Sequence, residues 1–145
     1  MANIIKLLVF IAAVLGITSC TTYLIPVESF KQQFLGIDSS DYVNVKVRGP
    51  IGEGYYYAAN PIGTIKCIDK KGNPHILKNS PSIEIRFTYG EKNKRTVFYF
   101  DRIFVNDSCV VGVRSRFVPS LTKTIPLNSI KKIEIQDGRK NFNYQ

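Results

Sequence analysis

The chain has 145 residues, of which 44% are hydrophobic and 21% charged, and its formal net charge at pH 7 is +9. This composition is that of one ordinary globular domain, and it excludes a disordered or collagen-like chain. His75 is the only histidine, so we assign no multi-histidine metal site and no serine triad.

The first twenty residues differ in kind from the rest. A single cation, Lys6, precedes eleven uncharged residues from Leu7 to Ile17, and small polar residues follow them. A membrane-spanning helix needs about 20 apolar residues, so this run is too short to span. A charged start, a short apolar core and small residues are the order of a secretory signal peptide. The alternative is a buried N-terminal helix, which would normally carry a polar face.

The end of this segment, Ile17-Thr18-Ser19-Cys20, resembles the lipobox of bacterial lipoproteins. The resemblance implies cleavage between Ser19 and Cys20, a diacylglycerol on the Cys20 sulfur and an acylated amino group. Two or three acyl chains hold a protein at a membrane far more firmly than one. Because Thr21 and not aspartate follows the cysteine, the resemblance favours the outer membrane. No acidic run that resembles a surface-export signal follows Cys20, which favours a domain that faces the periplasm.

We therefore divide the chain into a signal peptide (1–19), a lipidated N-terminus and tether (20–25), and one β-rich globular domain (26–145). The domain opens with IPVESFKQQFLG, where Pro26 marks a helix start and Gly36 its end. The apolar residues between them recur at helical spacing. We expect a short amphipathic helix that covers the end of a sheet; contact with lipid is the alternative.

Two later segments alternate between apolar and polar residues: YVNVKV at 42–47 and SIEIRFTY at 82–89. Period-two alternation predicts strands with one buried face. The sequence GPIGEG at 49–54 lacks the lysine ending and the helix of a phosphate loop. It predicts a turn between strands.

Three hairpins follow from the turn residues. One is TIKCIDKKGNPHIL, at 64–77. The second spans 95–116 around a two-residue Asn106-Asp107 loop, with its aromatic face in the core and Asp101 on a charged, solvent-facing side. The third is IEIQDGRKNFNY, at 133–144, and would pair Ile133 with Phe142.

Together these elements predict a mainly β fold of about seven to nine strands with one short N-terminal helix. A small antiparallel barrel or closed roll is the simplest such architecture, because closure limits exposed strand edges. The segments at 100–107 and 124–144 also resemble the ending of small uncharacterised lipoproteins of Gram-negative bacteria. That resemblance brings no assigned reaction, ligand or catalytic residue.

Apart from Cys20, the chain has two cysteines, Cys67 and Cys109. An oxidising compartment permits a disulfide between them, closing a loop of about 40 residues. The alternative is two buried thiols that act as small hydrophobic residues. Pairing of either thiol with His75 as a nucleophile is disfavoured, because apolar surroundings raise a thiol pKa.

The predicted binding surface combines a tyrosine run with basic loops. Tyr55, Tyr56 and Tyr57 must alternate if extended, so at least one faces solvent. The excess of positive charge favours anionic partners. Its residues lie mostly in or next to loops: Lys70, Lys71, Lys92, Lys94, Arg95, Lys131, Lys132, Arg139 and Lys140. The predicted surface uses Lys92, Lys94 and Arg95. Export argues against nucleic acid and for anionic envelope lipids, glycans or an acidic envelope protein. The alternative is a solvated basic surface without a partner.

We thus expect a non-enzymatic, lipid-anchored envelope module for binding or assembly, on the periplasmic side of the outer membrane, with no metal and no cofactor. A second hypothesis is a carrier that holds a small apolar ligand inside the barrel. A third, which the residues support least, is a hydrolase that uses carboxylates such as Asp101 and Glu134. We assign no catalytic residue.

Overall fold

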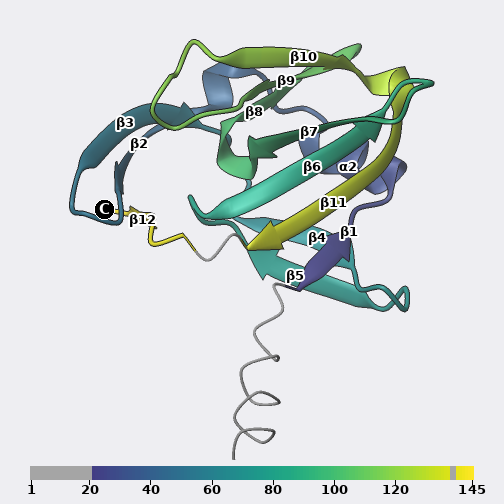
Figure 1. Cartoon of the computed structure of the whole chain (residues 1–145), viewed down its shortest axis with the longest axis horizontal. Coiled ribbons are helices and arrows are strands. Elements are labelled where there is room, and N and C mark those ends of the chain that lie inside the picture. The colour runs from purple at the N-terminus through teal and green to yellow at the C-terminus, as the bar shows by residue number, and fades with distance from the viewer. Residues whose placement is uncertain (1–20, 138–139) are drawn as a thin grey trace, which may run out of the picture.

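The computed structural model describes residues 21–137 and 140–145, which form twelve strands, one α-helix and three short 3-10 helices (Figure 1). The strands make three antiparallel sheets. The predicted mainly β fold with one short helix is confirmed. The closed barrel is not found: the described strands remain in three separate sheets, and they outnumber the seven to nine expected.

The largest sheet has six strands. In spatial order they are β5 (Pro74–Lys78), β4 (Thr64–Ile68), β1 (Thr22–Leu24), β11 (Ile130–Asp137), β6 (Ile83–Tyr89) and β7 (Lys94–Tyr99). The second sheet contains β10 (Thr122–Pro126), β9 (Cys109–Val113) and β8 (Ile103–Val105). The third contains β12 (Asn143–Tyr144), β2 (Val43–Arg48) and β3 (Gly54–Ala59). The 3-10 helices are η1 (Ser39–Asp41), η2 (Phe100–Arg102) and η3 (Leu127–Ser129).

The predicted helix is α2 (Val27–Phe34), which begins directly after Pro26. It lies behind the six-stranded sheet in Figure 1 and buries Phe30 and Phe34 in the core. The Phe30 ring contacts that of Phe87 in β6, with centroids 5.5 Å apart. The helix therefore covers the inner face of the sheet, as its apolar side predicts.

The predicted strand at 82–89, the hairpin at 64–77 and the turn at 49–54 are all present in the structure. In β6 every second residue from Ile83 to Tyr89 is buried. The β4–β5 hairpin pairs Thr64 with Lys78 and Ile68 with Pro74. The GPIGEG segment forms the turn between β2 and β3, where Gly52 has a φ of +89°, a conformation that favours glycine.

The second predicted hairpin is wrong in its register and in its charged face. The expected strand breaks at η2, after which the chain joins another sheet as β8. Val105 pairs with Val110 and not with Ser108. The loop is longer because the Asn106 carboxamide accepts hydrogen bonds from the backbone N–H groups of Ser108 and Cys109, at 3.0 and 2.8 Å. Asp101, expected in solvent, is fully buried.

The predicted C-terminal hairpin does not form. One edge of β11 pairs with β6 and the other with β1, where Thr22 lies opposite Gln136. No edge of β11 is therefore left for the C-terminus. Strand β12 pairs instead with β2, with Tyr144 opposite Val47, and so the expected pairing of Ile133 with Phe142 is wrong.

The second sheet lies against the first at a glycine. A Cβ atom at Gly112, in β9, would overlap the ring of Phe98, in β7. Both residues are buried. The absence of a side chain at Gly112 thus permits the close approach of the two sheets.

The predicted signal peptide (1–19), its cleavage between Ser19 and Cys20, and the lipid on Cys20 lie outside the described residues. The expected tether, 20–25, contains strand β1 in the middle of the largest sheet, so the globular domain begins earlier than expected. Within the described part of the chain, no helix has the length and apolar character to cross a membrane.

Candidate functional site

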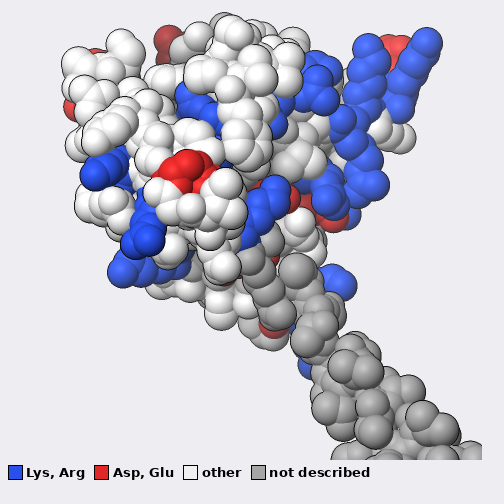
Figure 2. All heavy atoms as spheres, turned by 60° about the vertical axis from the view of Figure 1, so that its left-hand side comes forward, with Lys and Arg blue, Asp and Glu red and all other residues white. Residues whose placement is uncertain are grey.

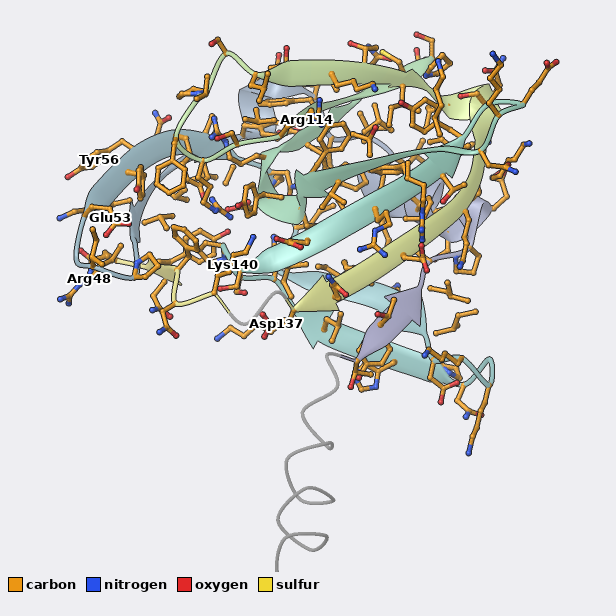
Figure 3. The ribbon with its side chains drawn as sticks, viewed as in Figure 1. Arg48, Glu53, Tyr56, Arg114, Asp137 and Lys140 are labelled. Carbon is orange, nitrogen blue, oxygen red and sulfur yellow. The ribbon has the colours of Figure 1, made fainter. Side chains whose placement is uncertain are left out.

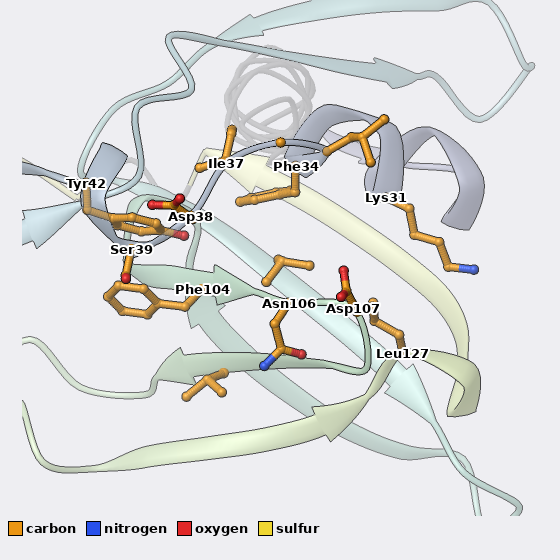
Figure 4. A pocket seen from close by; sticks show the side chains of 14 residues that line it. Lys31, Phe34, Ile37, Asp38, Ser39, Tyr42, Phe104, Asn106, Asp107 and Leu127 are labelled. Carbon is orange, nitrogen blue, oxygen red and sulfur yellow. The ribbon is translucent and has the colours of Figure 1, made fainter.

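A groove of about 680 Å³ lies between the C-terminal end of α2 and strands β8 and β9 (Figure 4). Its volume falls in the range of about 300–1,000 Å³ that small-molecule sites occupy. Most of its lining is apolar or aromatic, with polar side chains among them. The lining residues include Phe34, Leu35, Ile37, Tyr42, Phe104, Val105, Val111 and Leu127.

One wall of the groove is the loop that follows α2. Gly36 has a φ of +78°, which turns the chain away from the helix axis. Asp38 then caps η1: its carboxylate accepts a hydrogen bond from the Ser40 N–H at 2.7 Å, and its own N–H donates to the Asp41 carboxylate at 2.9 Å. The hydrogen bonds from Ser40 lower the pKa of Asp38. The wall is thus held by local hydrogen bonds.

The end of the groove next to this wall is aromatic. The rings of Tyr42 and Phe104 are stacked, with centroids 4.3 Å apart and an interplanar angle of 19°. The Tyr42 hydroxyl donates to the carbonyl of Ile103 at 2.9 Å. Burial raises the pKa of Tyr42 to about 12, so the phenol is neutral at physiological pH. The pair forms a fixed, uncharged end wall.

The rim of the groove carries an apolar side chain in solvent and a cation at its far end. Leu35 is 82% exposed. Figure 4 shows Lys31 at the end away from the Tyr42 and Phe104 rings, and its ammonium lies 3.1 Å from the Glu28 carboxylate. The groove thus combines an apolar lining with three charged side chains, Lys31, Asp38 and Asp107.

The predicted tyrosine run lies in β3, away from the groove. Tyr55 and Tyr57 are half-buried and Tyr56 is 76% exposed, as alternation along a strand requires. Figure 3 shows Tyr56 at the β2–β3 end of the molecule, near Arg48 and Glu53. Only one of the three tyrosines is thus available on the surface.

The basic residues predicted to join this surface do not lie beside it. Lys92, Lys94 and Arg95 are exposed at the turn between β6 and β7, on the opposite side of Figure 1 from the β2–β3 turn. Arg95 also bonds the Glu134 carboxylate at 3.3 Å. In Figure 2 the basic side chains form separate groups on a largely uncharged face. The structure does not bring the predicted surface together.

A buried polar cluster, which sequence reasoning missed, lies beneath β3. The side chains of Asp101 and Arg116 are fully buried, with 3.3 Å between their charged groups. The Asp101 carboxylate also accepts hydrogen bonds from the hydroxyls of Tyr57 and Tyr144, and Arg116 donates to the carbonyl of Pro81. Burial, followed by the charge of Asp101, raises the pKa of both tyrosines.

Aromatic rings surround the cations of this cluster. The Arg116 guanidinium lies 3.9 Å from the centroid of the Tyr99 ring and 4.9 Å from that of Phe142. The guanidinium of Arg102 lies 4.5 Å from the Tyr57 centroid, and burial lowers the pKa of Arg102. Two features of the sequence pointed to the cluster: Arg102 interrupts an apolar face, and Tyr99, Asp101 and Arg116 share the other face of the predicted hairpin.

The two cysteines are free thiols in different sheets, so of the two alternatives the structure shows the unbridged one. Cys67 lies in β4 and Cys109 begins β9. The Cys67 thiol is 3.5 Å from the His75 carbonyl, to which it donates, and burial raises its pKa. Its surroundings are those of a small hydrophobic side chain.

The carboxylates suggested for hydrolysis each have other partners. Asp101 belongs to the buried cluster, while Glu134 bonds Lys132 at 2.9 Å and Arg95 at 3.3 Å. The hydrogen bond from Lys132 lowers the pKa of Glu134. Among the described residues, no group of three or more His, Cys, Asp or Glu side chains is placed to hold a metal ion.

The groove is therefore the candidate functional site of this chain. No protein-family model, curated protein or solved structure matches the sequence or the fold.

Proposed function

We propose that this chain is a non-enzymatic binding module, held at the bacterial envelope by lipid on Cys20, whose groove beside α2 binds the apolar part of a ligand. The module faces the periplasm from the outer membrane. The observation that carries the proposal is the open apolar groove with its stacked Tyr42–Phe104 wall. The proposed location at the envelope rests on the resemblance of residues 17–20 to a lipobox.

The surface chemistry of the groove supports a binding role. Contiguous apolar surface that stays open to water marks sites of interaction more often than chance, and Leu35 contributes such surface at the rim. The groove also gives the carrier hypothesis a different geometry, because the ligand would lie between α2 and the β8–β9 hairpin and not inside a barrel.

Ligand capture tests the groove. We would extract the full-length protein from membranes in lipid nanodiscs and identify retained small molecules by mass spectrometry. Leu35→Glu places a charge on the apolar rim, and we expect at least about a tenfold loss of the retained compound, because an apolar ligand that covers this position would have to desolvate the carboxylate. Ile51→Glu is the matched control, since Ile51 is 92% exposed and lies outside the groove. Equal ligand content in the two variants would contradict the binding role.

The anchor has a separate test. Mass spectrometry of the N-terminal peptide from membrane fractions should show a diacylglycerol-modified Cys20 as the first residue, and Cys20→Ser should abolish the modification. An unmodified peptide that begins at Met1 would refute the anchoring.

A further inference from the structure

We propose that the β4–β5 hairpin docks onto the bilayer that holds the anchor, with its lysines binding anionic lipid headgroups. The hairpin comprises residues 64–78. The inference rests on the proposed lipid at Cys20 and adds an orientation: one defined surface of the domain lies against the membrane.

The first argument is the short distance between the anchor and the sheet. Strand β1 begins at Thr22, two residues after Cys20, and lies between β4 and β11. Two extended residues span at most about 7 Å. A lipid on Cys20 therefore holds the start of β1 close to the headgroups, without a linker that would let the domain turn freely.

The second argument is that this hairpin is the neighbour of β1. Leu24 pairs with Ile68, and the ring of Tyr23 stacks on that of His75, with centroids 4.4 Å apart and an interplanar angle of 10°. Figure 1 shows β5 and the start of β1 along the same edge of the domain. A bilayer at this edge meets the hairpin first.

The third argument is the charge of the hairpin. Four lysines are exposed, and none forms an ion pair within the described part of the chain: Lys66, Lys70, Lys71 and Lys78. The single carboxylate, Asp69, is engaged in the turn, where it accepts hydrogen bonds from the N–H groups of Lys71 and Asn73 at 2.8 and 2.9 Å. Unpaired basic groups next to a lipid anchor attract an anionic bilayer.

An apolar side chain lies among these lysines. Ile76 is 65% exposed in the edge strand β5. It pairs directly with Lys66, so the two side chains share one face of the hairpin, and Lys78 follows two residues later on that face. Lysines that flank an exposed isoleucine form an amphipathic surface suited to the boundary between headgroups and acyl chains.

Depth-dependent fluorescence tests the inference. We would reconstitute the full-length lipidated protein into phosphatidylcholine vesicles with or without phosphatidylglycerol, in a Cys109→Ser background. An environment-sensitive dye on Ile76→Cys would report contact with a quencher carried by lipid chains. The matched control is Glu91→Cys, which is exposed on the turn of the β6–β7 hairpin.

With phosphatidylglycerol, we expect quenching at position 76 to exceed that at 91 by at least about threefold, because charge attraction brings the hairpin to the lipid. Glutamine at all four hairpin lysines should remove the difference, whereas glutamine at Lys92, Lys94 and Arg95 should preserve it. Equal quenching at 76 and 91, with Cys20 shown to be lipidated, overturns the orientation and leaves the anchor intact. An unmodified Cys20 overturns both.

Discussion

The largest sheet and the β12-β2-β3 sheet are held in place by different forces. The first packs an apolar interior in which Phe30, Phe87 and Phe98 are almost fully buried. The second is joined to the rest of the molecule by the buried Asp101–Arg116 pair and the tyrosines around it. One region depends on the amount of apolar surface removed from water, and the other on the geometry of a few polar groups.

The difference follows from size. Strand β12 has only two residues, and a small sheet buries too little apolar surface to fix its own position. A buried ion pair adds little net stability, but the loss of one partner leaves the other charge uncompensated. The smaller sheet should therefore respond to charge and pH, whereas the larger one should respond mainly to side-chain volume.

The largest expected effect is in the apolar region. Phe87→Ala should lower the free energy of unfolding by about 4 to 5 kcal/mol, because the surrounding rings restrict collapse of the cavity. Urea denaturation measures the loss, and hydrogen exchange should show reduced protection throughout the domain. Phe117→Ala, at an exposed ring, should change stability by less than about 0.5 kcal/mol. Loss of protection in β2 and β3 alone would contradict the assignment of Phe87 to the common core.

The buried ion pair gives the next effect. Arg116→Ala should cost about 3 kcal/mol, since it leaves Asp101 buried without its cation. The Asp101→Ala/Arg116→Ala double variant should cost less than the sum of the two single variants, because it leaves no unpaired buried charge. Hydrogen exchange should increase first in β2, β3 and β12. Arg114→Ala is the exposed control, and additive losses in the double variant would argue against coupling.

The tyrosines of the cluster predict alkaline sensitivity. Burial raises the pKa of Tyr57, so the folded state keeps a proton that unfolded tyrosine releases near pH 10 (about its reference pKa). Stability should fall as pH rises above about 10. Tyr57→Phe should cost about 1 to 2 kcal/mol at neutral pH and make the alkaline fall shallower in pH-dependent urea denaturation. Tyr56→Phe, at the exposed neighbour, should retain the wild-type profile; a shallower fall there would contradict this explanation.

The smallest effect concerns a polar contact of the apolar region. The Gln33 side chain accepts a hydrogen bond from the Lys66 N–H at 2.8 Å and donates to the Lys66 carbonyl at 3.0 Å. Gln33→Ala should cost about 1 kcal/mol, because water replaces both bonds only in part. Thermal unfolding measures the change against Gln32→Ala, at an exposed neighbour on α2. An equal loss of stability in Gln32→Ala would show that the effect comes from alanine in the helix and not from the hydrogen bonds to Lys66.

Patterns of neighbouring residues were sufficient to predict the elements that are defined within one short stretch of the chain. The strict alternation of β6, the turn of the β4–β5 hairpin and the helix between Pro26 and Gly36 were all predictable, because each expresses one period or one turn type. The apolar groove was not. Its walls come from the loop after α2 and from β8 and β9, which no short-range pattern relates.

The same distinction explains the errors. Asp101 occupied a plausible position in a local hairpin, yet it is buried against Arg116. The predicted hairpin at 133–144 does not form, and its Lys140 bonds Glu84 of β6. Both outcomes depend on which strand edges are already hydrogen-bonded to another strand, as both edges of β11 are. Strand β1 pairs with β11, although the two strands lie near opposite ends of the chain. No pattern of neighbouring residues predicts that pairing.

A mainly β domain with one amphipathic helix could be predicted from the residue pattern, because hydrophobic period and turn chemistry are local properties of the chain. The resemblance of residues 17–20 to a lipobox, on which the proposed location rests, also comes from the sequence. The folded chain was needed to see that the strands divide among three sheets, that Asp101 and Arg116 meet in the interior, and that an apolar groove opens beside α2. These features arise from contacts between distant segments, where competition for strand edges and the cost of unpaired buried charge select one arrangement.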